Sequence, residues 1–487
     1  MKANHKSPHP PWALKHKKPG TEIRVINGHY YLYAISSKWD SNKKRAVKKT
    51  IGILGKITKE GFIESDKHRL RKGKPVIKKV WQREFGFTHF LQCCLQDSMH
   101  QLQQYFPDDW QTIIAMSFCR FVYQSPLKNM DFRFRHSYLS ELYPEVDLDR
   151  DHLTLFIRYL GEQREAIRNY FNAFWNNDKR SVLFDVSSIT SMSKRMEVFP
   201  QVGYNNNKNF DPQLNIMFIH CVEQRMPLYY RVLPGNIRDV KAFSLSLKEF
   251  DKKEVTVITD KGFYSNKNLQ EMRDEDIIYI VPLRRNAPLI DYAKLQGRDD
   301  KNLDGYFEFE KRIIWYYTLQ TDWGRLYVYI DDFLKAEEQR DYLMRTEKYP
   351  DNYSLEQYHQ KQSQFGTIAL LTNGGASAQD TYENYKSRNE IEILFDAYKN
   401  ILHADRTYMQ NNIAIEAWMF INFIAMQWYY ITFNLLKKYK LTKIYSPQDL
   451  MMKLAEIRKI KINDEWYLAE TTKATHDLLN KLKIPIP

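Results

Sequence analysis

The chain has 487 residues, more than one hydrophobic core usually spans, so we expect two or three domains or one domain with a large insertion. Hydrophobic residues make up 43% and aromatic residues 14%, which excludes a mainly disordered chain. The net charge is +14, and residues 1–50 hold twelve Lys or Arg against two acidic residues. This imbalance favours a polyanionic partner, with a merely solubilising surface as the alternative.

Three further features limit the cellular setting. The four cysteines lack the paired spacing of a zinc site or a disulfide framework, so we expect a reducing, cytoplasmic compartment. The first 20 residues are basic and interrupted by prolines, which indicates a flexible arm and not a secretory signal. Residues 413–436 are long and apolar, but Glu416, Asn422 and Gln427 interrupt them, which favours a buried core helix over a membrane span.

Changes in periodicity divide the chain into four parts. Residues 1–80 form the basic arm and a small β-hairpin module, built from β-rich segments within 21–57. Residues 81–178 have apolar residues at helical spacing and are predicted to be a helical DNA-binding or linker region. Residues 179–405 alternate strands and helices, and residues 406–487 are predicted to be helical. The fold class is therefore α/β, with a mixed sheet flanked by helices.

The third part has a definite order of elements. It begins with a strand at 179–185, a hairpin at 214–234 and a helix at 239–250, and continues with the strand 254–260, a helix at 265–275 and a strand at 277–283. Residues 284–365, with two β-rich runs and a short helix at 337–347, look inserted. A buried strand resumes at 365–373 and leads directly into the helical stretch 382–400.

Two aspartates each end an apolar, β-rich run. Asp185 closes VLFD and Asp260 closes VITD. Because ligands of open sheets collect in the crevice beyond the carboxyl ends of strands, two carboxylates delivered there can converge on one metal site. Hard oxygen ligands of this kind suit Mg²⁺ or Mn²⁺. The alternative is that each aspartate only caps the turn that follows it.

Residues 382–400 contain several glutamates on one amphipathic helix. At about 100° per residue, Tyr385, Arg388, Glu392 and Lys399 fall within an arc of about 60°. A carboxylate among cations on one helix face suits a site where a metal-bound phosphate is held, whereas the commoner alternative is a solvated face of ion pairs.

The other carboxylates of this stretch are placed less well. Glu383 and Glu390 fall well away from that face, and Asp396 is the one rival near its edge. Glu392 is therefore the candidate that the helix face selects.

The gaps between Tyr385, Arg388, Glu392 and Lys399, following two strand-end aspartates, resemble the Tyr-Arg-Glu-Lys signature of bacterial insertion-sequence transposases of the DDE type. The order of elements from 179 to 402 is similar to the RNase H-like catalytic domain of that family, and the segment at about 284–365 resembles its β-rich insertion. One departure is Ser187, since the family often has threonine two positions after the first aspartate.

The resemblance implies a site and an activity. Asp185, Asp260 and Glu392 would bind two Mg²⁺ or Mn²⁺ ions and catalyse cleavage at transposon ends and strand transfer into target DNA. Phosphates of the transposon end would be contacted by Tyr385, Arg388 and Lys399. The partners implied are double-stranded DNA, as terminal inverted repeats and as target, and a second copy of the chain in a synaptic complex, in a bacterial or archaeal cytoplasm.

Secondary candidates lie at two strand ends. Asn236 or Asp239 follows a strand and is expected near the site, although Asp239 could equally cap the next helix. Arg284 and Arg285 follow another strand and could contact phosphates, or be simple surface charge. His220, within an apolar run, is expected to be a core histidine.

Two alternatives remain open for the function. The first is a metal-dependent DNA nuclease without strand transfer, which the sequence does not separate from a transposase. The second is a transposase-derived, non-catalytic DNA-binding protein. The presence of Asp185, Asp260 and Glu392 argues against the second, because a binding module needs no metal-binding carboxylates.

Overall fold

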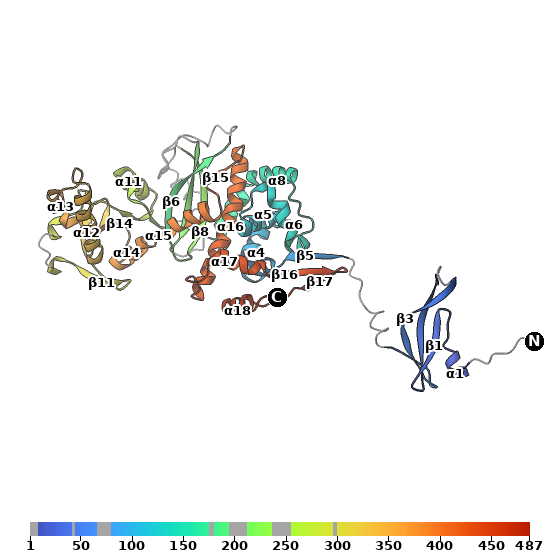
Figure 1. The fold of residues 1–487 in the computed structure, drawn as a ribbon. Helices are drawn as coiled ribbons and strands as arrows, with labels where there is room; N and C mark the ends of the chain where they lie inside the picture. The colour runs from blue at the N-terminus through green and yellow to red at the C-terminus, as the bar shows by residue number, and fades with distance from the viewer. Residues whose placement is uncertain are drawn as a thin grey trace, which may run out of the picture. The chain divides into compact units, whose positions relative to one another are not determined.

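The computed structural model describes residues 8–40, 44–65, 79–174, 180–193, 212–235, 255–295 and 300–487 (Figure 1). The chain divides into two compact units. One comprises Met1–Trp81 with Lys461–Glu465, and the other comprises Gln82–Ile460 with Trp466–Pro487.

The N-terminal unit is built on a four-stranded antiparallel sheet in the order β1-β2-β3-β4. Its elements are α1 (Pro11–Leu14), β1 (Thr21–Ile26), β2 (His29–Asp40), β3 (Arg45–Ile57) and β4 (Phe62–Glu64). Asn27 and Gly28 join β1 to β2 with φ of 50° and 78°, the positive values that a two-residue Asn-Gly hairpin requires. The buried core is small and consists of Ala13, Ile23, Leu32 and Ile57.

The second unit begins with a helical region, as the periodicity predicted. Its helices are α3 (Gly86–Cys94), α4 (Gln96–Tyr105), α5 (Trp110–Tyr123), α6 (Met130–His136), α7 (Leu139–Leu142), α8 (Arg150–Glu162) and α9 (Arg164–Ala173). Both α5 and α8 pack against α16 (Asn412–Lys438), a helix from the far end of the chain. This packing joins the helical region and the C-terminal region into one core.

The main sheet has ten strands in the order β11-β12-β13-β14-β10-β9-β6-β7-β8, with β15 pairing with β6 beside this path. Strands and helices of its central part are β6 (Arg180–Ser191), β7 (Gln213–Cys221), β8 (Met226–Pro234), β9 (Val255–Ile258), α11 (Asn266–Asp274), β10 (Ile278–Pro282), β14 (Thr367–Thr372) and β15 (Arg406–Thr407). Strands β6, β9 and β10 run parallel, whereas β7, β8 and β14 are antiparallel to their neighbours. The predicted mixed sheet flanked by helices is confirmed.

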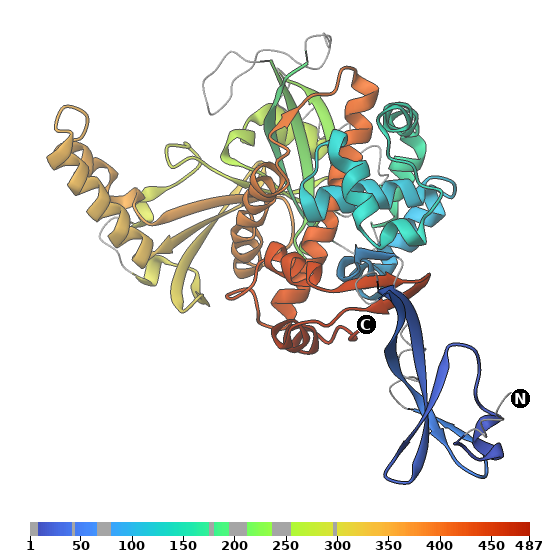
Figure 2. The ribbon, with the colours of Figure 1, turned by 45° about the vertical axis from the view of Figure 1, so that its right-hand side comes forward.

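Residues 284–365 do not form a separate sheet. Strands β11 (Gly305–Phe309), β12 (Arg312–Thr321) and β13 (Gly324–Asp331) extend the main sheet, because β13 pairs with β14. The short helix predicted here is longer, α12 (Asp332–Lys348), and α13 (Leu355–Lys361) occupies a stretch predicted to be a polar connector. Figure 2 shows these strands and α12 extending the sheet to one side.

The C-terminal region is not entirely helical, contrary to the prediction. Between α17 (Pro447–Ala455) and α18 (Lys473–Leu482), the strands β16 (Arg458–Ile462) and β17 (Glu465–Leu468) pair, in a three-stranded sheet with β5 (Val80–Glu84). Their connection, Asn463 and Asp464, has φ of 49° and 76°, so both residues adopt the left-handed conformation of a tight hairpin turn.

The long apolar stretch is a buried helix, as predicted. Polar side chains of α16 find partners in the core: Asn422 accepts a hydrogen bond of 2.8 Å from Arg120, and Gln427 accepts one of 2.8 Å from Tyr170. Such pairing offsets the cost of burying polar groups. In the described part of the chain, no helix is both long and apolar enough to cross a membrane.

Candidate active site

Asp185 and Asp260 lie where the parallel ladder between β6 and β9 ends. The last paired residues are Leu183 and Ile258, so each aspartate stands two residues beyond them. The prediction that Asp185 ends its own strand is wrong, because β6 continues to Ser191 with Asp185 paired opposite Phe218 of β7. Pairing with the antiparallel strand β7 keeps β6 extended beyond Asp185, whereas the shorter strand β9 ends at Ile258.

The missing partner leaves a gap along one edge of β6. Beyond the aspartate, that edge is next paired by β15, whose Arg406 and Thr407 lie beside Thr190 and Ser191. Among the described residues, no strand pairs with this edge between 184 and 189. Gaps of this kind are where ligands reach the sheet of an α/β domain.

Side-chain direction places Asp185 on one face of the sheet. Residues two apart in a strand point to the same side, so Asp185 faces the same way as Leu183, whose core cluster includes Ile391. Phe218, its cross-strand partner, packs on Phe395 and Tyr398 with ring centroids 5.5 and 5.3 Å apart. Asp185 therefore faces the helical stretch that follows β14.

That stretch is not the single regular helix that the sequence predicted. It consists of α14 (Ala378–Lys386), a turn at 387 and 388, α15 (Asn389–Asp396) and a π-helical turn, η6 (Ala397–Ile401). A projection at a constant 100° per residue is therefore wrong across it.

The two irregularities change the winding in opposite directions. At the turn, the amide of Arg388 donates to the Tyr385 carbonyl (3.0 Å) and the amide of Ile391 donates to the Arg388 carbonyl (3.1 Å), both bonds spanning three residues. Three residues per turn bring Tyr385 and Arg388 into line. In η6 the amide of Leu402 donates to the carbonyl of Ala397, five residues back, at 2.9 Å. Single π turns of this kind often occur at functional sites.

Arg388 holds two of the candidate carboxylates. Its Nη1 lies 3.0 Å from Glu392 Oε1, and its Nη2 lies 3.5 Å from Asp260 Oδ1. The arginine side chain is 21% exposed, whereas those of Glu392 and Asp260 are 58% and 44% exposed. One partly buried cation thus stands between a carboxylate from the end of β9 and one from α15.

Asp185 is the most buried of the three carboxylates. Burial raises its pKa to about 6, and the negative charges of Asp260 and Glu392 act in the same direction. A hydrogen bond of 2.8 Å from the Val186 amide and the charge of Arg388 lower the pKa but do not offset the burial. The three carboxylates are therefore electrostatically coupled in one site.

Tyr385 and Lys399 belong to the same site. Burial raises the pKa of Tyr385, which also lies in the field of Arg388, Asp260 and Glu392. Burial lowers the pKa of Lys399, against the charges of Asp405 and Asp185. The structure thus brings together all six of the aspartates, glutamate, tyrosine, arginine and lysine singled out in the sequence.

The other carboxylates of the stretch lie elsewhere. Glu390 pairs with Arg225 at 3.4 Å, and burial raises its pKa. Asp396 accepts a hydrogen bond of 2.6 Å from Asn400, and Glu383 accepts one of 2.9 Å from Gln379. The preference for Glu392 over these rivals agrees with their positions.

The two arginines after β10 differ. Arg285 donates to Glu338 at 2.7 Å and to the Thr367 carbonyl, so it ties α12 to the start of β14. It also lines a cavity of about 230 Å³ that Tyr385 and Arg388 border. Arg284 is exposed, and no hydrogen bond of its side chain is found among the described residues.

Asn236 and Asp239 lie outside the described residues. His220 is a core residue, as predicted: it is buried on β7 and packs edge-on against Tyr430, and burial lowers its pKa to about 3.

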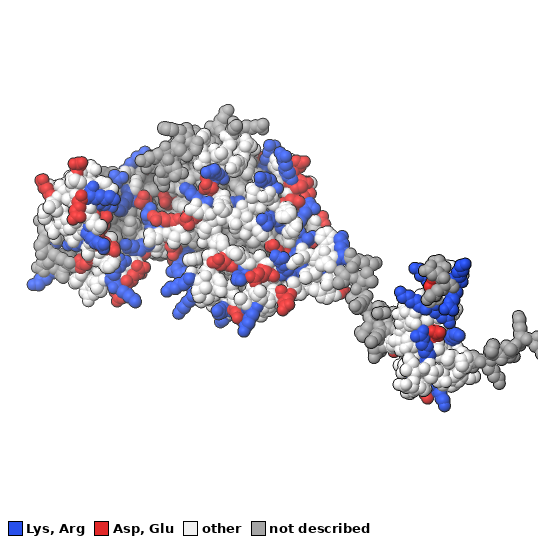
Figure 3. Space-filling model, in the orientation of Figure 1, with Lys and Arg blue, Asp and Glu red and all other residues white. Residues whose placement is uncertain are grey.

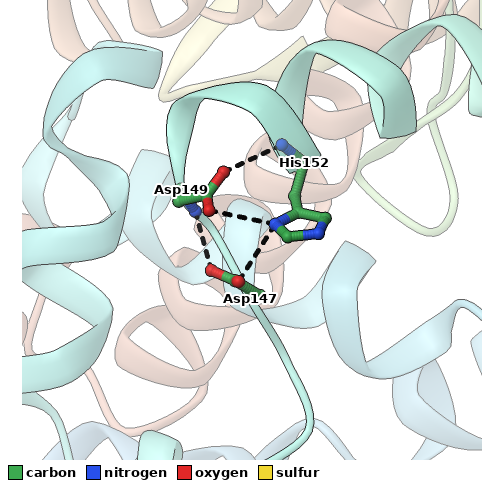
Figure 4. A group of neighbouring side chains, drawn as sticks. All are labelled: Asp147, Asp149 and His152. Atoms are coloured by element: carbon green, nitrogen blue, oxygen red, sulfur yellow. Dashed lines mark hydrogen bonds and ion pairs between the residues drawn. The ribbon is translucent and has the colours of Figure 1, made fainter.

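A second polar cluster, which the sequence reasoning missed, lies at the start of α8 (Figure 4). His152 Nδ1 is 3.0 Å from carboxylate oxygens of both Asp147 and Asp149. Asp149 also caps α8 by accepting from the amides of Asp151 and His152. The pattern Asp-Leu-Asp before an amphipathic helix was the available signal. These exposed contacts are accounted for by helix capping.

The chemistry of the donor set fits a divalent metal. Asp185, Asp260 and Glu392 offer only hard carboxylate oxygens, and Arg388 offsets only part of their combined negative charge. The oxygens are not all within 4.8 Å of one another, since Arg388 stands between two of them. Cations bound here would take over the neutralising role of that arginine.

Comparison with known proteins identifies the region. A family model described as transposase DDE domain matches residues 176–428, a range that contains all three carboxylates. No match is found among curated proteins. One similar solved structure is a piggyBac transposase synaptic complex with hairpin DNA, at 10% identity and a TM-score of 0.39, covering 77% of this chain and 80% of that chain. At that TM-score the likeness supports no conclusion about this chain.

Proposed function

This chain belongs to the transposase DDE domain family, and from this we propose that it cleaves the DNA ends of its own mobile element and joins them to target DNA. The observation that supports the proposal is the convergence of Asp185, Asp260 and Glu392, from three separate elements, on one arginine. We assign the catalytic role to these three carboxylates.

Two divalent cations, Mg²⁺ or Mn²⁺, would be held by the three carboxylates. When bound, such ions lower the pKa of an attacking water or 3′-hydroxyl and stabilise the leaving oxygen of an in-line phosphoryl displacement. Asp185 must be ionised to act as a ligand, and its buried position keeps its carboxylate oriented by the Val186 amide. Glu392, which is 58% exposed, can reorient toward a bound ion.

The cations around the carboxylates would bind the phosphates of the DNA end. Arg388 can exchange its carboxylate partners for a phosphate, with the bidentate geometry that guanidinium offers. Tyr385, close to Arg388, and Lys399, close to Asp185, are both half-buried and would bind the same DNA strand. Arg284, Arg285 and Asn236 are proposed as further DNA contacts, Arg284 being free to move and Arg285 already anchored.

Transposition requires two ends to be held together, so we propose that two copies of the chain act in one complex with terminal repeats and target DNA. A nuclease that never joins strands would share every residue of this site. The two reactions therefore differ in their products and not in their active sites.

The test is incubation of the purified protein with DNA carrying the sequences that flank its own gene, with and without Mg²⁺ or Mn²⁺. Glu392→Gln is compared with Glu390→Gln, a matched change two residues away on the side that faces Arg225. Metal-dependent 3′-hydroxyl ends and joined products, lost with Glu392→Gln and kept with Glu390→Gln, support the proposal. Cleavage without joining favours the nuclease, and binding without cleavage favours a non-catalytic DNA-binding protein.

A further inference from the structure

The net positive charge of the chain lies in its N-terminal unit. Residues 1–81 contain 21 Lys or Arg against five Asp or Glu, whereas residues 82–487 contain 52 against 54. The net charge of +14 therefore arises entirely before residue 82. In Figure 3, Lys and Arg atoms on this unit are accompanied by few Asp or Glu atoms, whereas both signs are mixed over the rest of the visible surface. Long-range attraction to a polyanion must come from this unit and not from the region of the carboxylates.

Part of this unit is a ribbon only two strands wide. Strand β1 pairs with β2 only up to Ala34, and β4 pairs with β3 only at Gly55–Ile57. Beyond these pairings, β2 and β3 continue to pair with each other alone. They form five residue pairs there, from Ser36 with Lys49 to Asp40 with Arg45. We call residues 36–40 and 45–49 the β2–β3 ribbon; Figure 2 shows the two long strands.

The β2–β3 ribbon is basic and exposed. It carries Lys38, Arg45, Lys48 and Lys49 against the single acidic Asp40. All four cations are exposed. Trp39 is 67% exposed, although it is a large apolar side chain, and it is not among the residues of the small core of this unit.

Strand alternation sorts these side chains onto two faces. Opposite residues of paired strands share a face, as do residues two apart, so Lys38, Arg45 and Lys49 lie on one face. Trp39 and Lys48 lie on the other. The ribbon thus presents cations on both sides and an aromatic ring on one.

We propose that the β2–β3 ribbon binds duplex DNA by entering the major groove, with its cations on the flanking phosphates and Trp39 against base edges. The major groove of B-DNA admits a two-stranded ribbon, and five residue pairs extend about 17 Å, enough to follow the groove floor. The deep, narrow major groove of A-form RNA excludes it. This inference concerns DNA binding and not the proposed cleavage and joining. It rests on the proposed function in one respect, the identification of the polyanion as DNA.

The test measures Kd of the full-length protein for a three-turn DNA duplex, without divalent metal, across a range of salt concentrations. The variant Lys38→Gln/Arg45→Gln/Lys49→Gln removes one face of cations. The matched control, Lys443→Gln/Lys473→Gln/Lys481→Gln, removes three exposed lysines from the C-terminal region. We expect the ribbon variant to bind roughly tenfold or more weakly, with a salt slope smaller by about two to three, because each lost phosphate contact releases about one fewer counterion.

Two further comparisons keep the result interpretable. Lys38→Arg/Lys49→Arg keeps the charge and should bind like the unmodified protein, which would show that loss of charge, and not any change of side chain at these positions, weakens binding. Trp39→Ala should weaken binding without changing the salt slope, since no charge is lost. Duplex RNA and anionic lipid vesicles should bind more weakly than duplex DNA.

The inference is overturned if the two triple variants weaken binding equally, or if the unmodified protein binds duplex RNA or vesicles as tightly as duplex DNA. Because binding is measured without metal, its outcome is independent of the cleavage assay. Loss of DNA binding in the ribbon variant would support the proposal that the β2–β3 ribbon binds duplex DNA, even if the unmodified protein cut no DNA.

Discussion

Asp185 and Asp260 stand at equal height in the sheet, each two residues beyond the last pair of the β6–β9 ladder, Leu183 with Ile258. Two carboxylates so placed, with Glu392 nearby, repel one another, and the charge of Asp260 adds to burial in raising the pKa of Asp185. Arg388 offsets only part of this repulsion. Without a bound cation, the site is therefore a source of instability in the folded protein.

Replacing Asp185 by Asn should stabilise the metal-free protein near neutral pH. The folded-state pKa of about 6 lies above the ordinary value of 3.8 for an aspartate, so folding favours the protonated form. The stabilisation of the folded state by protonated Asp185 is fully present below about pH 4 and is lost as the pH rises through about 6. A difference of this size corresponds to about 2–3 kcal/mol at about pH 7.5, from 1.36 kcal/mol per pKa unit.

The measurement is urea unfolding in EDTA at about pH 4.5 and about pH 7.5. Asp341→Asn, at an exposed carboxylate paired with Arg345, serves as the control and should change little at either pH. If Asp185→Asn destabilises the protein at both values, Asp185 makes a stabilising contact and the argument from repulsion is wrong.

Metal affinity should decrease as the pH is lowered, because Asp185 becomes protonated. Only the ionised carboxylate is a ligand, so a pKa of about 6 predicts roughly tenfold weaker Mn²⁺ binding at about pH 5 than at about pH 7.5. Calorimetric titration measures it. The protein for this experiment carries Asp149→Asn, which removes one carboxylate from the exposed cluster at α8 and keeps a good helix cap. Equal affinity at both pH values would show that Asp185 is not a ligand.

The buried strands of the main sheet could be predicted from sequence because apolar runs specify them, and β7, β9, β10 and β14 lie where they were expected. The hairpin of β16 and β17 was missed although its signal was present. Ile460 and Ile462 alternate with lysines before Asn463 and Asp464, a turn pair with φ of 49° and 76°. The strands are only five and four residues long, and the flanking helices obscured their period.

The sequence selected residues that the structure brings close together at the candidate site, but the backbone that brings them together could not be predicted. Residue types and gaps selected Glu392 over Glu390, yet the tight turn at Arg388 and the π turn after Asp396 follow from packing on the sheet. A constant helical period has no means of representing them. Likewise, Asp185 lies beyond the end of β9 because β9 is shorter than β6 in the assembled sheet. The relative lengths of two strands cannot be read from either segment of sequence alone.

Arg388→Ala should separate metal binding from DNA cleavage. At about pH 8, well above the pKa of about 6 for Asp185, that carboxylate is ionised, and removal of the competing guanidinium should strengthen Mn²⁺ binding several-fold. Near pH 6, loss of its charge raises the pKa of Asp185 further, and binding should weaken. Cleavage should fall by roughly 10²-fold or more at every pH if Arg388 also binds a phosphate.

Arg345→Ala, which breaks an exposed pair with Asp341, is the control and should leave both properties unchanged. Unchanged Mn²⁺ affinity of the Arg388 variant at about pH 8 would mean that the arginine does not compete with the ions.

Arg120 should support the site from the core. It is 2% exposed, and burial lowers its pKa to about 10. Its guanidinium donates to Asn422 Oδ1, to the carbonyls of Gln124 and Ser125, and to the carbonyl of Leu402, directly after the π turn that carries Lys399. Arg120→Met would leave these acceptors buried without a donor, at a cost of about 3–5 kcal/mol.

Because the carbonyl of Leu402 would lose its partner, the π turn should also lose its fixed position. We therefore expect Arg120→Met to reduce cleavage even at temperatures where circular dichroism shows the variant fully folded. Arg135→Met, which removes an exposed pair with Asp131, should cost less than about 0.5 kcal/mol and leave cleavage unchanged. Urea unfolding and cleavage rates for the two variants decide the matter. If Arg120→Met proves as mild as Arg135→Met, the buried network neither stabilises the fold nor positions the π turn.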